Sequence, residues 1–241
     1  MAATVCSLIV MQWNARALNP RTAELKNFLH EANPKIDVVC INETRLDKNM
    51  TFKLQGYNVI KKDRVSEHLG GGVITLVRAG INFQEIPSPD ELECITIKVY
   101  LKNEQICISN VYIAPLANPS RKSIEELFHH KEKSIITGDF NGHSALWGNK
   151  DVNKMGRILD ELVDENEFVV LNTGEPTYQK AEGGMPALDV NLALSNITSK
   201  CTWSMHDNPL GSDHLPTLTF ITGVDAGKQQ GEGNYNLKKG D

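Results

Sequence analysis

Two polar clusters, far apart in the chain, contain the residue types that hydrolytic chemistry uses. Asp139 and Asn141 follow the apolar run 134–137, so both side chains are expected where a buried strand meets solvent. Asp213 and His214 form the second cluster. A carboxylate can bind a hard cation or orient water, an amide can hold a phosphate oxygen without adding charge, and a histidine beside a carboxylate can meet an anion. Phosphoester hydrolysis needs all of these groups.

Each cluster alone also has a structural interpretation, because Asp, Asn and Gly concentrate at strand-to-loop turns and Ser-Asp caps helices. Two further strand ends strengthen the chemical interpretation. Asn14 ends the first predicted strand and Glu43 follows the second, so both are expected at the sheet edge that carries Asp139. Glu43 is the best single candidate for a magnesium ligand, because Mg²⁺ prefers one or two carboxylates plus water molecules.

Tyr112 and Asp189 extend this pattern. A tyrosine at a strand end most often serves packing, but here Tyr112 is expected to hydrogen-bond a phosphate oxygen as charge develops on it. Asp189 lies inside an apolar strand, where an unpaired acid is costly. Its expected partner is His214, because a carboxylate on one ring nitrogen orients the imidazole and favours its charged form. The other ring nitrogen is then free for phosphate.

Strand and helix signals interleave along the whole chain. Apolar patterning predicts strands over residues 5–13, 36–41, 57–61, 72–77, 93–101, 105–112, 134–138, 168–171, 188–194, 201–205 and 215–221. Amphipathic helices are predicted to start near Asn19 with Pro20 at the first helical position, at Ser123, and at about Asn153. Many strands, few helices and some very short connections predict an α/β fold with two packed mixed β-sheets flanked by helices.

Composition restricts the function classes. The 241 residues, 40% hydrophobic, suit one domain over 1–222, followed at 223–241 by a polar stretch expected to be a disordered tail or linker. No apolar run approaches the roughly 18 residues of a membrane span, so no membrane partner is expected. Five cysteines without a Cys-x-x-Cys pair predict a reduced, intracellular protein without structural zinc. The net charge of −5 argues against bulk electrostatic coating of nucleic acid, but it does not exclude a metal-dependent nuclease.

Together these residues resemble the endonuclease/exonuclease/phosphatase superfamily, and more narrowly the endonuclease domains of non-LTR (LINE-type) retrotransposons. The motifs are Trp13-Asn14-Ala15-Arg16, Gly138-Asp139-Phe140-Asn141 with His143 and Trp147-Gly148, Leu188-Asp189, and Leu210-Gly211-Ser212-Asp213-His214-Leu215-Pro216. The resemblance covers nearly the whole chain before the tail and implies a four-layer α/β sandwich. Asn191 departs from the family threonine, which could alter strand packing or a phosphate contact.

The resemblance implies a role for each catalytic position. Asp139 is expected to orient and deprotonate the attacking water, with Asn141 beside it. Asp189 is expected to support His214, and Tyr112 to contact the scissile phosphate.

It also implies a metal and DNA contacts. Glu43 is expected to be the principal ligand of Mg²⁺, with Mn²⁺ as a possible substitute, while Asp213 lies close to the metal and Asn14 belongs to both the metal and the phosphate site. The segment 175–184 matches a hairpin with which the family probes the DNA minor groove. The residues expected to contact DNA are Arg16, Thr177, Tyr178 and Ser212.

The function implied is a Mg²⁺-dependent endonuclease that nicks one strand of double-stranded DNA. Its 3′-hydroxyl product would prime reverse transcription in the nucleus, by a reverse transcriptase domain fused to or following this chain. Two alternatives stay open. One is an abasic-site repair nuclease or another phosphodiesterase or phosphatase of the same superfamily. The other is a catalytically silent DNA-binding module.

Overall fold

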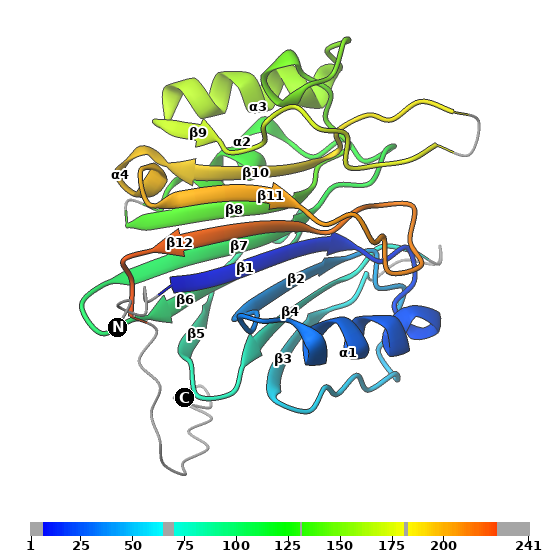
Figure 1. The fold of residues 1–241 in the computed structure, drawn as a ribbon. Helices are drawn as coiled ribbons and strands as arrows, with labels where there is room; N and C mark the ends of the chain where they lie inside the picture. Colours follow the sequence, from blue (N-terminus) through cyan, green and yellow to red (C-terminus); the bar gives the residue numbers. More distant parts are fainter. Residues whose placement is uncertain (1–6, 65–69, 131, 181–182, 226–241) are drawn as a thin grey trace.

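The computed structural model describes residues 7–64, 70–130, 132–180 and 183–225, in which runs of strands are separated by a few helices (Figure 1). The strands are β1 (Ser7–Asn14), β2 (Val38–Asn42), β3 (Tyr57–Lys62), β4 (Val73–Arg78), β5 (Asn82–Ile86), β6 (Glu93–Tyr100), β7 (Gln105–Tyr112), β8 (Lys133–Asp139), β9 (Phe168–Val170), β10 (Asp189–Leu194), β11 (Cys201–Met205) and β12 (Thr217–Thr222). The helices are α1 (Thr22–Glu31), α2 (Arg121–Glu125), α3 (Lys154–Glu165) and α4 (Ser195–Thr198), with 3-10 turns η1 (Asn19–Arg21), η2 (Glu126–Phe128) and η3 (Ala145–Trp147).

The strands form two mixed, six-stranded sheets that pack face to face. The first has the order β11-β12-β1-β2-β4-β3 and the second the order β5-β6-β7-β8-β10-β9. Both sheets contribute to one apolar core, in which Leu8 and Val10 of β1 lie in a cluster with Ile95 of β6 and Ile135 of β8. Burial of these apolar faces against each other is the main force that holds the sheets together.

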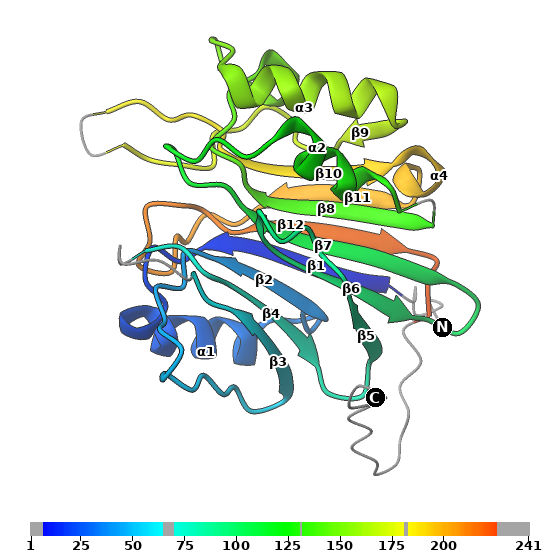
Figure 2. The same cartoon turned by 180° about the vertical axis from the view of Figure 1, so that it is seen from behind.

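Helices cover the outer face of each sheet. Leu25 and Leu29 of α1 pack on the first sheet, and Leu159 and Leu162 of α3 pack on the second. Figures 1 and 2 show α1 on one outer side of the molecule and α2 and α3 on the other. The order helix, sheet, sheet, helix confirms the predicted four-layer sandwich.

The strand pattern agrees closely with the sequence-based expectation, apart from β5. Every predicted strand is present with small shifts at its ends, and residues 5 and 6 of the first prediction lie outside the described residues. The additional strand β5 pairs along its whole length with β6 at the edge of the second sheet. Its exposed Asn82, Gln84 and Glu85 hide the apolar alternation, so pairing with β6 and not local sequence determines this strand.

Two helix starts differ from the prediction, and each has a local cause. The residues at Asn19 and Pro20 form the 3-10 turn η1, and the Asn19 amide bonds Met50 and caps no helix, so α1 begins only at Thr22. The cap of α2 is Ser120, whose hydroxyl accepts a hydrogen bond from the backbone N–H of Ser123. The third prediction is confirmed, since Asn153 caps α3.

Gly138 permits the close pairing of β7 and β8. Its φ is +155°, and a Cβ there would lie 1.8 Å from the carbonyl oxygen of Val111. We expect Gly138→Ala to lower the free energy of unfolding by about 2 kcal/mol or more, measured by urea denaturation. Gly80→Ala is the matched control, because Gly80 also has a positive φ of +89° but no atom within 4 Å of the added Cβ. Equal effects of both substitutions would contradict this explanation.

The end of the described chain packs against the body of the domain. Val224 is buried in the inter-sheet core, two residues beyond the predicted end of the domain at 222. Most of the predicted tail, 226–241, lies outside the described residues. Among the described helices, none is both long and apolar enough to cross a membrane.

Candidate active site

In the second sheet, strand register places three candidate residues side by side. Tyr112 at the end of β7 pairs with Asp139 at the end of β8, because these strands run parallel. Asp139 in turn pairs with Asp189 at the start of β10, which runs antiparallel. A one-residue shift in either pairing would turn these side chains to the other face. Strand register therefore fixes the relative positions of Tyr112, Asp139 and Asp189.

The first sheet contributes Asn14 and Glu43. Asn14 ends β1 opposite Asn42, which ends the parallel strand β2, and Glu43 follows directly. The Asn14 amide nitrogen Nδ2 lies 2.7 Å from Asp139 Oδ2 and 3.3 Å from Glu43 Oε1. Asn14 therefore bridges the two sheets and joins the two carboxylates that sequence reasoning placed in one pocket.

His214 is paired with Asp189, as predicted. Its Nδ1 lies 2.8 Å from Asp189 Oδ2, and its Nε2 lies 3.9 Å from Asp139 Oδ2. Burial of the imidazole opposes its protonation, but the Asp189 carboxylate outweighs burial and raises the pKa of His214 to about 9. Burial raises the pKa of Asp139, while the nearby His214 opposes this shift. The Tyr178 ring lies against the imidazole, with the ring centroids 4.6 Å apart.

Glu43 is held by three donors. Tyr112 Oη donates to Glu43 Oε1 over 2.8 Å, and Arg45 donates to Oε2 over 2.7 Å. Partial burial favours the neutral acid, but hydrogen bonds from Arg45, Tyr112 and Asn14 outweigh it and lower the pKa of Glu43. Burial, followed by the negative Glu43, raises the pKa of Tyr112 well above its usual range. Tyr112 is therefore a neutral hydrogen-bond donor.

Several of these side chains line a cavity of about 350 Å³. It is lined by Arg16, Glu43, Arg45, Pro115, Asp139, Asn141, His143, Tyr178, Lys180, Pro186, Leu188, Asp213 and His214. Arg16 forms an ion pair with Asp213 at its rim. In both ribbon views, the β9–β10 loop and the β11–β12 loop project at the end of the molecule where β1 ends (Figures 1 and 2).

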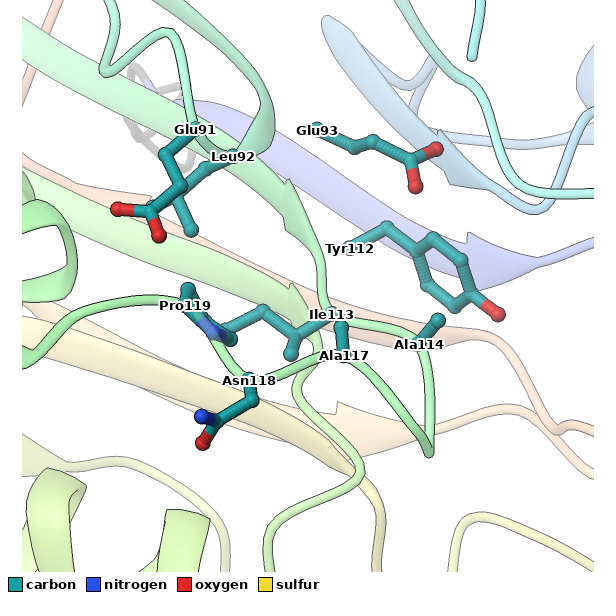
Figure 3. A pocket seen from close by; sticks show the side chains of 9 residues that line it. All are labelled: Glu91, Leu92, Glu93, Tyr112, Ile113, Ala114, Ala117, Asn118 and Pro119. Carbon is teal, nitrogen blue, oxygen red and sulfur yellow. The ribbon is translucent and has the colours of Figure 1, made fainter. Parts of the chain in front are cut away.

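A second, smaller cavity of about 210 Å³ adjoins the site on the other side of Tyr112. Figure 3 shows the phenol pointing away from Glu91 and Asn118, which line this second cavity. Glu91 is engaged by the Ser120 and Ser123 hydroxyls. The Tyr112 hydroxyl therefore belongs to the Glu43 site, and the second cavity lies behind its ring.

The residues predicted to contact DNA lie in different surroundings. Thr177 is fully buried, and its hydroxyl accepts hydrogen bonds from the backbone N–H groups of Leu188 and Asp189. This hydroxyl fixes the hairpin base to β10, and a DNA contact of Thr177 stays a prediction. Ser212 is partly buried and donates to the Asn14 carbonyl. Arg16 and Tyr178 line the cavity, as a DNA contact requires.

Two amides have more restricted roles than predicted. The Asn141 Nδ2 donates to the Ile113 carbonyl, and its backbone N–H donates to Asp139. Asn14 presents Nδ2 to the carboxylates, because its Oδ1 accepts from the Arg16 backbone. This orientation suits a donor that positions Asp139 better than a metal ligand. Asn191 bonds Thr137 and is buried, so its departure from the family pattern concerns strand packing.

A buried polar network beneath the site was missed by sequence reasoning. Gln12 Nε2 donates to Asn42 Oδ1 over 2.9 Å and to Asp189 Oδ1 over 2.7 Å. Asn42 Oδ1 also accepts from the backbone N–H of Asp139, and its Nδ2 donates to Asn110. The available signal was the presence of amide residues inside apolar strands, since a buried amide must find partners.

A divalent metal is implied by the predicted family, and two sets of residues could hold it. Ligand atoms of Asp139, Asp189 and His214 lie within 4.8 Å of one another. However, Asp189 is fully buried and each of its oxygens already accepts a short hydrogen bond. Glu43 and Asp213 fit better. Both carboxylates line the cavity, and the arginine on each is 42% and 55% exposed in its side chain, so a hard cation can replace it.

Comparison with known proteins shows which proteins share this fold. The chain matches the family model described as endonuclease-reverse transcriptase over residues 106–218. The structure is similar to an AP endonuclease from Leishmania major, with a TM-score of 0.74, 16% identity, and coverage of 90% of this chain and 88% of that one. The chain thus has the fold of the endonuclease/exonuclease/phosphatase superfamily, as the motifs predicted.

The similarity is also to retrotransposon proteins in particular. The endonuclease domain of TRAS1, a telomere-specific non-LTR retrotransposon, superposes with a TM-score of 0.75 at 19% identity, covering 89% of this chain and 98% of that domain. The RNA-directed DNA polymerase from mobile element jockey of Drosophila funebris is 27% identical over 215 residues, or 87% of this chain. A probable RNA-directed DNA polymerase from transposon BS of Drosophila melanogaster is 24% identical over 89% of this chain. The resemblance to LINE-type endonuclease domains is confirmed, and this chain spans about a quarter of the length of these polymerases.

Proposed function

We propose that this chain is a Mg²⁺-dependent DNA endonuclease that nicks one strand of a duplex by phosphodiester hydrolysis. The observation that carries the proposal is the meeting of Glu43, Asp139 and His214 in one cavity, although they come from three separate parts of the chain. The similarity to retrotransposon polymerases and to the TRAS1 endonuclease domain supports DNA as the substrate.

Asp139 is the group that accepts a proton from water. Its Oδ2 is fixed by Asn14, while its other oxygen accepts from the Asn141 backbone, so the carboxylate has one orientation. A water molecule bound to this carboxylate is aimed into the cavity and can attack phosphorus in line.

His214 donates to the phosphate, and Tyr112 can do so once its one hydroxyl proton turns away from Glu43. With Nδ1 held by Asp189, the imidazolium has its Nε2–H left to stabilise the charge that develops on a phosphate oxygen. The Tyr112 hydroxyl supplies a neutral donor beside Glu43. Glu43, with Asp213 near it, would hold Mg²⁺ or Mn²⁺, which supplies Lewis-acid stabilisation of the phosphate when bound.

We further propose that the nick leaves a 3′-hydroxyl that primes reverse transcription in the nucleus, by a reverse transcriptase domain encoded with this chain. This proposal is supported by the relatives, which are RNA-directed DNA polymerases about four times as long as the match. Product ends test it. A DNA polymerase should extend the nicked strand directly, whereas failure to extend without prior phosphatase treatment would exclude a primer role.

The experiment for the nuclease activity is relaxation of supercoiled plasmid. Open circles should accumulate with Mg²⁺, and the plasmid should stay supercoiled with EDTA. An abasic-site nuclease is the second candidate, supported by the fold similarity to the Leishmania AP endonuclease. A duplex with one abasic site would be cut much faster than an intact duplex only under this second function. Tight duplex binding without any cleavage would indicate a silent binding module.

A further inference from the structure

A second histidine–aspartate pair lies at the cavity, with only its histidine in the lining, and the hydrolysis described above does not use it. His143 lines the cavity, and its Nδ1 lies 2.8 Å from Asp151 Oδ2. An ionised carboxylate only accepts hydrogen bonds, so Nδ1 donates. Within the described part of the chain, the other ring nitrogen, Nε2, has no hydrogen-bond partner. The pair repeats the arrangement of His214 and Asp189, with one nitrogen held and one available.

The backbone that carries His143 is rigidly attached to α3. Asn153 Oδ1 accepts from the His143 N–H over 3.0 Å and from Gly156 N over 2.8 Å. A Cβ at Gly156 would lie 1.8 Å from the His143 carbonyl, so the helix approaches the loop more closely than any other residue allows. Trp147 Nε1 holds the neighbouring Gly142 carbonyl. The imidazole is therefore placed before any ligand arrives, which reduces the entropy cost of binding.

Charge on this side of the cavity suits an anion. Lys180 lines the same cavity as His143. The hydrogen bond from His143 lowers the pKa of the Asp151 carboxyl, and the positive charge of Lys180 acts in the same direction. An imidazole between a carboxylate and a phosphodiester can give one ring N–H to each anion. The candidate metal ligands, in contrast, are carried by the first sheet. Glu43 follows β2, and Asp213 lies between β11 and β12.

We propose that His143 binds a phosphate of the DNA strand next to the scissile phosphate, and that Asp151 positions its ring for this contact. Lys180 adds positive charge to the same subsite. This inference rests on the proposed endonuclease function and extends it. His143, which the hydrolytic step leaves free, is thereby a substrate-binding residue. Its contact would set the register of the DNA strand across the cavity.

The test combines a substitution with a modified substrate. Nick sites of the wild-type protein are first mapped on plasmid DNA. Duplex oligonucleotides are then made with one such site and a single uncharged methylphosphonate at each flanking position in turn. The quantity compared is kcat/KM for wild type and His143→Gln. We expect His143→Gln to lose about tenfold on unmodified DNA, the loss of one charged hydrogen bond, mainly through KM. Wild type should lose a similar factor at one flanking position.

The decisive result is that the two losses do not multiply at that position. A merely structural role of His143 would instead lower the rate by the same factor on every duplex. Asp151→Asn should lower kcat/KM by a smaller factor than His143→Gln, and this loss too should not multiply at that position. His30 is an exposed histidine on α1, and His30→Gln should leave kcat/KM unchanged. Multiplying losses at every position, or unchanged kinetics of His143→Gln, would overturn the inference while leaving the nuclease function intact. Absence of any wild-type nicking would overturn both.

Discussion

Asp139→Asn is expected to lower the nicking rate roughly 10²- to 10⁴-fold, the range typical of removing a general base. Asparagine has nearly the same shape and can keep one of the hydrogen bonds from Asn14 and Asn141. It cannot accept a proton from water. Single-turnover cleavage of a duplex with a mapped site measures the effect, with Asp164→Asn on the exposed face of α3 as the matched control.

The fold should survive this substitution. Asp139 is almost fully buried, and replacing a buried carboxylate by a neutral amide removes a desolvation cost. Thermal unfolding and metal-free duplex binding are therefore expected to stay close to wild type. A variant that cleaves within tenfold of the wild-type rate would show that another group activates the water.

Removal of the imidazole is the second large effect. His214→Ala should lower kcat roughly 10²- to 10³-fold, because a preorganised donor to the phosphate is lost from a water-poor site. The variant Asp189→Asn keeps the His214 imidazole but removes the carboxylate charge that favours its protonation. It therefore tests the charge of the imidazole separately from its presence. The imidazolium persists up to about pH 9 in the wild type because of Asp189, so nicking should decline as pH rises through that value.

Without the Asp189 charge, burial favours the neutral ring, and the alkaline decline should move toward neutral pH. At the acid end, activity should fall as pH drops below the raised pKa of Asp139, since a protonated carboxyl cannot accept a proton. The measurement is kcat/KM against pH for both proteins. An alkaline limb at the same pH in Asp189→Asn would mean that His214 does not act as a charged donor.

The sequence predicts most of this fold because local and global preferences agree. Buried strands such as β2 and β8 read as apolar runs that end in polar residues, and their ends carry Glu43 and Asp139. Edge strand β5 lacks this signal, because most of its side chains face solvent. The cap of α2 moved upstream to Ser120 because Glu91, distant in sequence, fixes that serine. Tertiary contacts of this kind leave no local pattern.

The site was predictable to the extent that its residues sit at strand ends. The pairing of Asp189 with His214 followed from the cost of a buried acid. The bridging amide of Asn14 and the network around Gln12 did not follow, because side-chain direction and strand register are set by the packing of both sheets. The same limit applies to Thr177, whose hydroxyl serves the backbone of β10.

The most direct test of the central claim is the dependence of nicking on Mg²⁺ concentration in wild type and Glu43→Gln. Glutamine keeps the hydrogen bonds from Tyr112 and Asn14 but is a weaker ligand for a hard cation. The half-saturating Mg²⁺ concentration should rise about tenfold or more, while Glu91→Gln, at the neighbouring cavity, should behave as wild type. An unchanged Mg²⁺ dependence in Glu43→Gln would contradict a metal-dependent phosphodiester site at this cavity.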